Sequence, residues 1–181
     1  MKPTFKELTD YLVALGTADI GHTEKTYLAH AIGVYNDMKA WGASTDLCHA
    51  ALFHSIYGTQ GFQDFTLPLD RRPELQGLIG EYAEKLAFLN CFMERSSLDA
   101  QVSESKDEYP IIHRVTGEVL PLTKTEYDDL VCLHLCDLLE QVARANAWNI
   151  RRAAYRGMAE RLGGVALAAY DRVYAKEPVQ A

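Results

Sequence analysis

A chain of 181 residues, 48% of them hydrophobic, fits one domain with a single core, so we predict one domain spanning residues 1–181. The formal charge of −7 comes from 18 basic and 25 acidic residues with interspersed signs, which argues against nucleic acid as a partner. The first residues, MKPTFKELTDYLVAL, lack the apolar run of a secretory signal, so we expect a cytoplasmic protein with no membrane partner. The thiols of Cys48, Cys91, Cys132 and Cys136 lie in apolar helical patterns without zinc-ribbon spacing, as expected of buried cysteines in a reducing compartment.

The first third of the chain shows helical spacing of apolar residues. It predicts helices over residues 4–15, 24–40 and 44–54, with Thr23 and Ser44 as the caps of the second and third. Glycines and prolines then interrupt the pattern, so residues 55–72 are expected to form a long ordered loop.

The remainder is also mainly helical. Helices are predicted over residues 73–96, with a kink near Gly77 or Gly80, over 123–146, opened by a Thr123–Glu126 capping box, and over 150–174. Between them we expect a mobile linker over 96–110 and a small β-hairpin over 111–123 that turns at Thr116–Gly117. The predicted fold class is therefore all-α, with about six helices and one small hairpin.

Three of these helices place polar residues on apolar faces. His54 ends the stripe formed by Leu47, Ala50 and Ala51, and His30 lies on the equivalent face of the preceding helix. In LVCLHLCDLLEQV, His134 and Asp137 interrupt an apolar run. A buried carboxylate needs a cation, because its desolvation otherwise costs several kcal/mol. A metal held by His30, His54 and Asp137 would supply one.

Each residue also has a simpler interpretation. A single buried histidine is usually a core residue bonded to a backbone carbonyl, and Asp137 could pair with an arginine such as Arg95, Arg144 or Arg151. Joint ligation gains weight because three helices each offer a candidate ligand. Two imidazoles and one carboxylate suit one divalent transition metal, Mn, Fe or Zn.

The same residues carry a family resemblance. The segment YLAHAIGVYNDMKAWGASTDLCHAALFHSIYGT, residues 27–59, resembles the opening of an HD-domain protein, and most of all the hydrolase domain of the RelA/SpoT enzymes. YLAH supplies His30, AALFH supplies His54, IGEYAEKLA resembles the middle helix, and LCDLLEQV supplies Asp137. The resemblance covers residues 22–145 and implies an HD-like helical bundle that binds a metal.

This chain departs from the family pattern at two places. Ser55 stands where the family has the aspartate of its His-Asp doublet, and the Glu-Asp pair that activates water falls near Gly58 and Thr59. The expected ligand set is therefore His30, His54 and Asp137, with His22 or His134 as a further ligand. The segment is also similar to an uncharacterised HD-like subgroup in which His-Ser is usual.

The resemblance implies a metal-dependent hydrolase acting on a small phosphorylated or otherwise anionic metabolite. A general base would come from Glu81 or Glu84 on the fourth helix. The candidates for binding the substrate are two loop residues and four arginines: Tyr57, Thr59, Arg71, Arg72, Arg95 and Arg114.

Two other functions stay open. Two histidines and one carboxylate with open positions are typical of mononuclear non-haem iron oxygenases. The loss of the aspartate at Ser55 would also suit a catalytically inactive HD-like binding protein. The apolar terminal helix VALAAYDRVY could form a homodimer or cap the core of its own chain.

Overall fold

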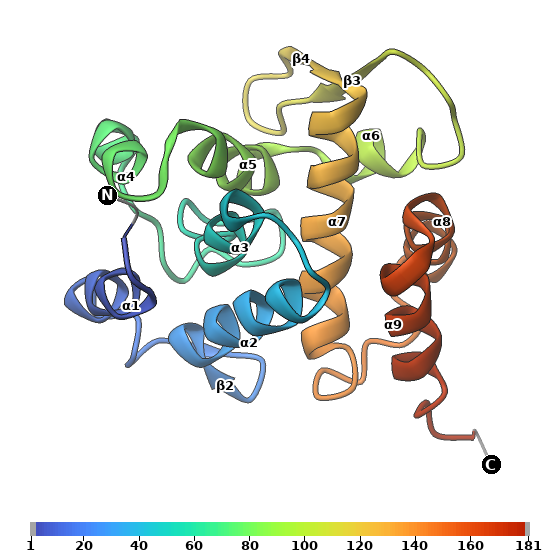
Figure 1. Cartoon of the computed structure of the whole chain (residues 1–181), viewed down its shortest axis with the longest axis horizontal. Helices are drawn as coiled ribbons and strands as arrows, with labels where there is room; N and C mark the ends of the chain where they lie inside the picture. The colour runs from blue at the N-terminus through green and yellow to red at the C-terminus, as the bar shows by residue number, and fades with distance from the viewer. Residues whose placement is uncertain (1–2, 180–181) are drawn as a thin grey trace.

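The structure is a computed structural model in which residues 3–179 are described. Within that range the chain is mostly helical, with nine α-helices, one 3-10 helix and two small two-stranded sheets (Figure 1). The elements of the first half are α1 (Phe5–Ala14), β1 (Gly21–His22), β2 (Lys25–Thr26), α2 (Tyr27–Ala40), α3 (Thr45–Leu52), η1 (Leu69–Arg71), α4 (Arg72–Ile79) and α5 (Glu81–Phe92). Those of the second half are α6 (Arg95–Asp99), β3 (Glu108–Ile112), β4 (Val119–Thr123), α7 (Lys124–Gln141), α8 (Arg152–Leu162) and α9 (Gly164–Tyr174).

Side-chain caps explain where several helices begin. The hydroxyl of Ser44 accepts a hydrogen bond from the Leu47 amide at the start of α3, and Thr123 forms the predicted capping box with Glu126 at the start of α7. The cap predicted for α2 is wrong. Thr23 lies in the tight turn between β1 and β2, and Thr26 caps the helix instead.

The two longest predicted helices, over residues 73–96 and 150–174, are each divided at a glycine. The kink predicted near Gly77 or Gly80 is a complete break at Gly80. Gly80, at φ 94°, separates α4 from α5, and Gly163, at φ 63°, separates α8 from α9, since a side chain is disfavoured at these backbone angles. The predicted linker over residues 96–110 is wrong as well. It includes most of α6, contributes buried side chains such as Leu98, and ends in β3.

The predicted hairpin is present and longer than expected. β3 and β4 pair antiparallel from Glu108 opposite Thr123 to Ile112 opposite Val119, and Gly117 takes the positive φ of the turn. Beyond the end of β3, His113 also pairs with Met93, which attaches the hairpin to the end of α5.

α7 is the central helix of the molecule (Figure 1). Its residues 133–139 are all buried, because α2, α3 and α5 pack on one side of it and α8 and α9 on the other. The stripe of α9 that could have formed a dimer interface is buried within the chain through Ala166, Ala169, Tyr170 and Tyr174. In residues 3–179 no helix is long and apolar enough to cross a membrane.

Candidate metal centre

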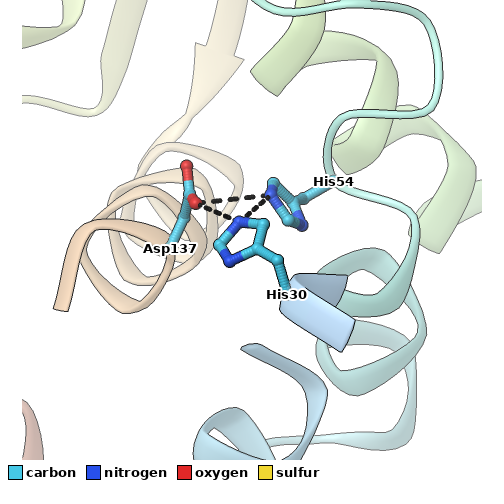
Figure 2. Close-up of side chains that lie close together, drawn as sticks. All are labelled: His30, His54 and Asp137. Carbon is cyan, nitrogen blue, oxygen red and sulfur yellow. Dashed lines mark hydrogen bonds and ion pairs between the residues drawn. The ribbon is translucent and has the colours of Figure 1, made fainter. Parts of the chain in front are cut away.

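The three predicted ligands come from three parts of the chain and meet beside α7 (Figure 2). His30 lies in the first turns of α2, which Thr26 caps. His54 follows the end of α3, where Phe53 leaves the helical conformation, and its Nδ1 lies 2.7 Å from the carbonyl oxygen of Ala51. Asp137 projects from α7. All three residues are buried, with exposures of 0%, 1% and 7% in this order.

The distances between the three ligand atoms suit a transition-metal ion. The Nε2 atoms of His30 and His54 are 3.2 Å apart, and Asp137 Oδ1 lies 3.0 Å from the first and 3.3 Å from the second. At metal–ligand distances of about 2.1 Å, neighbouring ligand atoms are about 3.0 Å apart in an octahedron and about 3.4 Å apart in a tetrahedron. The observed separations fall within these limits.

The hydrogen bonds on the far side of each imidazole define its tautomer. His54 Nδ1 must donate to the Ala51 carbonyl, and His30 Nδ1 donates to Glu140 Oε2 at 2.5 Å. Each Nε2 is then the nitrogen that carries a lone pair when the imidazole is neutral. Two such nitrogens and a carboxylate oxygen converge on one point, which is an arrangement that only a cation or a proton can stabilise.

The pKa shifts of Asp137 and His30 also indicate that the cluster needs a positive charge. Burial alone would raise the pKa of Asp137, but the proximity of His54 and the hydrogen bond with His30 lower it well below its usual range. Burial would lower the pKa of His30, yet its contacts with Asp137 and Glu140 raise it to about 9. In the absence of a metal these contacts favour a second proton on His30, at Nε2, and a bound ion would take the place of that proton.

Glu140 supports the site from behind His30. Its carboxylate contacts His30, accepts hydrogen bonds from Arg144, and forms an ion pair with Lys25 at 2.8 Å. Burial opposes its ionisation, but these partners lower the pKa of Glu140 to about 2. A carboxylate behind a ligating histidine orients the ring and increases its basicity, which is the usual outer arrangement of metal sites.

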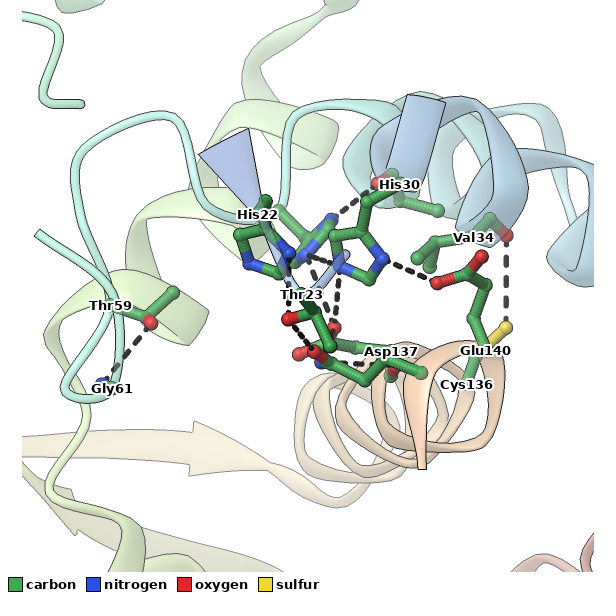
Figure 3. A network of polar contacts seen from close by, with 12 residues as sticks. His22, Thr23, His30, Val34, Thr59, Gly61, Cys136, Asp137 and Glu140 are labelled. Carbon is green, nitrogen blue, oxygen red and sulfur yellow. Dashed lines mark hydrogen bonds and ion pairs between the residues drawn. The ribbon is translucent and has the colours of Figure 1, made fainter. Parts of the chain in front are cut away.

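A second chain of hydrogen bonds leads from Asp137 to His22 (Figure 3). Gln141 donates its amide to Asp137 Oδ1 and accepts the hydroxyl proton of Thr23 at 3.0 Å. His22 Nδ1 must then donate to Thr23, 3.2 Å away, which leaves the lone pair on Nε2. The ring of His22 stacks on that of His30 at 4.3 Å, and burial together with His30 lowers the pKa of His22 to about 4.

A cavity of about 380 Å³ opens beside the cluster. His54 and Asp137 form part of its wall, together with His22 and Thr23 from the β1–β2 turn. The loop after α3 and the segments around α6 and α8 complete it, with Ser55, Thr59, Gly61, Phe62, Asp64, Arg95 and Tyr155 among the residues that line it. A small molecule in this cavity would therefore contact His54 and Asp137, whereas His30 lies behind them.

The remaining predicted ligand, His134, belongs to a separate cluster. Its Nε2 accepts hydrogen bonds from Arg151 at 2.8 Å and from the Tyr155 hydroxyl at 3.1 Å, and its Nδ1 faces Asn90. Burial and the charge of Arg151 lower the pKa of His134 well below its usual value. Both nitrogens are thus occupied, and among residues 3–179 the group able to hold a metal is His30, His54 and Asp137.

The predicted catalytic glutamates lie in a different part of the molecule. Glu84 is fully buried and binds Arg72, Gln76 and the Tyr57 hydroxyl, while Glu81 and Glu84 line a separate pocket between α4, α5 and β4. Tyr57 and Arg72 are therefore engaged in holding α4 against α5. Neither glutamate is among the residues that line the cavity at the metal cluster.

The predicted substrate-binding arginines do not all lie at the metal cavity. Arg71 pairs with Glu74, and Arg114 donates to the backbone carbonyls of Cys91 and Gly58. Arg95 and Thr59, by contrast, line the metal cavity. None of the arginines considered as alternative partners pairs with Asp137 in the described structure, since Arg144 binds Glu140 and Arg151 binds Asp99.

Comparison with known proteins adds a partial match. A family model described as a domain of unknown function (DUF6817) matches residues 11–95, a segment that contains His30 and His54 but not Asp137. The comparisons with curated proteins and with solved structures found no match.

Several residues of the centre were missed in the sequence. Glu140 and Gln141 lie three and four positions after Asp137, so helical spacing alone places them on the same face of α7. Arg144, which the sequence offered only as a partner for Asp137, lies in the turn after this helix and binds Glu140 instead. The sequence therefore contained a signal for these residues of α7. It contained none for Thr23, whose position depends on the β1–β2 turn.

Proposed function

We propose that this chain is an HD-like, metal-dependent hydrolase of a small metabolite. The observation that carries the proposal is the convergence of two histidine Nε2 atoms and a carboxylate oxygen, all buried, with His54 and Asp137 at the wall of a cavity. Helices supply or precede the three ligands in the order His, His, Asp, as in the HD pattern that residues 27–59 resemble. The partial match to a domain of unknown function neither favours nor opposes this assignment.

A divalent ion bound here would lower the pKa of a water molecule and polarise the bond to be hydrolysed. The chain itself has to hold the ligands in place and accept a proton. Glu140 and Ala51 orient the two imidazoles. His22 and Asp64 line the cavity and carry atoms that can accept a proton from water, so they replace Glu81 and Glu84 as the candidates for the base.

Metal content tests the site directly. Protein purified without chelator or nickel should contain close to one Mn, Fe or Zn ion per chain by elemental analysis. His54→Ala and Asp137→Ala should lose it, whereas His113→Gln, which changes a buried histidine at the hairpin, should retain it. If the parent protein stays metal-free after anaerobic reconstitution, the proposal is contradicted and an inactive binding protein is favoured.

A second candidate is a mononuclear iron oxygenase. It is favoured by the ligand set itself, because Ser55 stands where a hydrolase of the HD type has a further carboxylate ligand, leaving two histidines and one carboxylate. Oxygen dependence separates the two. A hydrolase loaded with manganese should turn over equally well with and without oxygen, whereas an oxygenase should require iron and consume oxygen.

A further inference from the structure

Arg95 is a charged side chain without a partner at the wall of the metal cavity. The residue is half-buried, and within residues 3–179 its guanidinium group forms no hydrogen bond or ion pair. Every other arginine in this region has one: Arg114 binds two carbonyls and Arg151 binds Asp99. A half-buried guanidinium has lost part of its hydration, so an unpaired one at a cavity wall favours an anionic ligand.

The loop after α3 leaves room for that guanidinium. A Cβ atom at Gly61 would lie 3.1 Å from Arg95 Nη1, closer than most Cβ contacts, so the glycine lets the guanidinium lie against the loop backbone without shifting. Gln60 further fixes the start of α6 by accepting a hydrogen bond from the Arg95 amide at 3.0 Å. The position of Arg95 is therefore built by the loop that also bears Thr59.

A second polar group in the same cavity is also unsatisfied. The Ser55 hydroxyl is 2% exposed and lies beside the buried Tyr27 hydroxyl, and neither forms a hydrogen bond with any other group in residues 3–179. If these two hydroxyls bond to each other, one of their protons still needs an acceptor. Thr59 adds a third hydroxyl, whose oxygen accepts from the Gly61 amide at 3.3 Å and whose proton is unused (Figure 3).

We infer that Ser55, Thr59 and Arg95 form an oxyanion-binding wall that holds a carboxylate or phosphate group of the substrate. This inference deepens the proposed function, on which it rests for the reacting end of the substrate at the metal. The charges at the cavity favour an anion. A divalent ion and Arg95 together carry more positive charge than the negative charge of Asp137 and Asp64, and Asp64 is exposed to solvent. Ser55, the departure from the HD pattern, then serves as a hydrogen-bond donor to the substrate.

Calorimetric titration with inorganic phosphate and with malonate tests the wall in the manganese-loaded full chain. Arg95→Gln should weaken the binding of at least one of these anions about tenfold or more, because it removes a charge-assisted contact. Arg172→Gln removes the same charge from an exposed position on α9 and should change the affinity less than about twofold. Arg95→Lys keeps the charge but not the planar fork and should lie between them.

The outcomes separate this inference from the proposed metal site. Equal anion binding by Arg95→Gln and Arg172→Gln, or no binding of either anion by the parent, would overturn the wall even if manganese binds. Arg95-dependent binding that persists in His54→Ala would support the wall and show that it does not depend on the metal. Thermal melts of all variants show whether a loss reflects unfolding, and Ser55→Ala should give a smaller loss than Arg95→Gln.

Discussion

Glu140 is the residue on which the orientation of His30 depends. Its carboxylate accepts the Nδ1 proton of His30 and is itself held by Lys25 and Arg144. Replacing it by an amide keeps the shape of the side chain but removes the charge that directs the His30 lone pair at the site. The substitution should therefore reduce metal affinity more than it reduces the stability of the fold.

Glu140→Gln should therefore weaken metal binding by about 10- to 100-fold, the range typical of such outer partners. Competition with a chelating dye measures the affinity. Glu177→Gln is the matched control, because Glu177 also accepts two hydrogen bonds from an arginine, Arg152, and neither residue lines the metal cavity. Unchanged affinity in Glu140→Gln would mean that Ala51, Asp137 and packing suffice to orient the ligands.

Gly33 provides the space that Glu140 occupies. A Cβ atom at this position of α2 would lie 2.6 Å from Glu140 Oε1, whereas Gly77 in α4 has no neighbour within 4 Å of its Cβ position. Alanine in a helix is about 1 kcal/mol more favourable than glycine. Gly77→Ala should thus stabilise the protein by up to about 1 kcal/mol. Gly33→Ala should gain nothing and should weaken metal binding, as measured by urea unfolding and by dye competition.

At the scale of elements, Glu84 joins the two helices on either side of Gly80, because its carboxylate on α5 binds Arg72 and Gln76 on α4. Burial opposes ionisation of this fully buried carboxylate, but Arg72, Gln76 and Tyr57 together lower its pKa below the usual value. Arg72 also lies over the ring of Phe88, 3.8 Å from its centroid. Helices α4 and α5 and the loop after α3 thus share one charged centre.

Arg72→Met should cost about 3–5 kcal/mol of unfolding free energy at neutral pH, because Glu84 would remain buried without its cation. Arg71→Met is the control. Its pair with Glu74 is exposed and should contribute less than about 1 kcal/mol.

Since the pKa of Glu84 is lower in the folded state than in the unfolded state, the stability that Glu84 gives the parent is lost as the pH falls below about 4.5. The difference between parent and Arg72→Met in chemical denaturation should therefore narrow in acid; a constant difference would contradict the role of Glu84.

The elements show which features a sequence can specify. The beginnings of α3 and α7 were predictable because Ser44 and Thr123 are local caps. The role of Glu84 was not. Its partner Arg72 lies twelve positions earlier, beyond the break at Gly80, so helical spacing could not connect them. Glu84 was therefore named as a candidate base, whereas in the structure it holds two helices together.

At the scale of the whole molecule, the ligands were predictable and the cavity was not. His30, His54 and Asp137 each interrupt an apolar stripe, so burial on a common core follows from periodicity. The rest of the cavity wall comes from the β1–β2 turn, the loop over residues 55–72, the start of α6, and the segment that runs from the end of α7 into α8. Irregular backbone carries no periodic signal, which is why six candidate substrate-binding residues could be named but only Thr59 and Arg95 line the cavity.

The metal centre also connects distant parts of the chain, so its occupation should stabilise the whole fold. His30 and Asp137 are 107 positions apart, and His54 follows a third helix. An ion that binds only the folded chain should add about 2.7 kcal/mol at a free concentration 100 times its dissociation constant. For a domain of this size that corresponds to a rise in melting temperature of about 5–10 °C.

Differential scanning calorimetry of metal-free protein with added manganese or zinc measures this rise, and a chelator should reverse it. Asp137→Ala should show none, because removing the carboxylate eliminates the charge that retains the ion. Arg95→Gln should show the full rise, since its guanidinium faces the cavity and is not a ligand. A rise of equal size in Asp137→Ala would mean that the ion binds elsewhere, and the buried cluster would then be a proton-bearing structural element of the core.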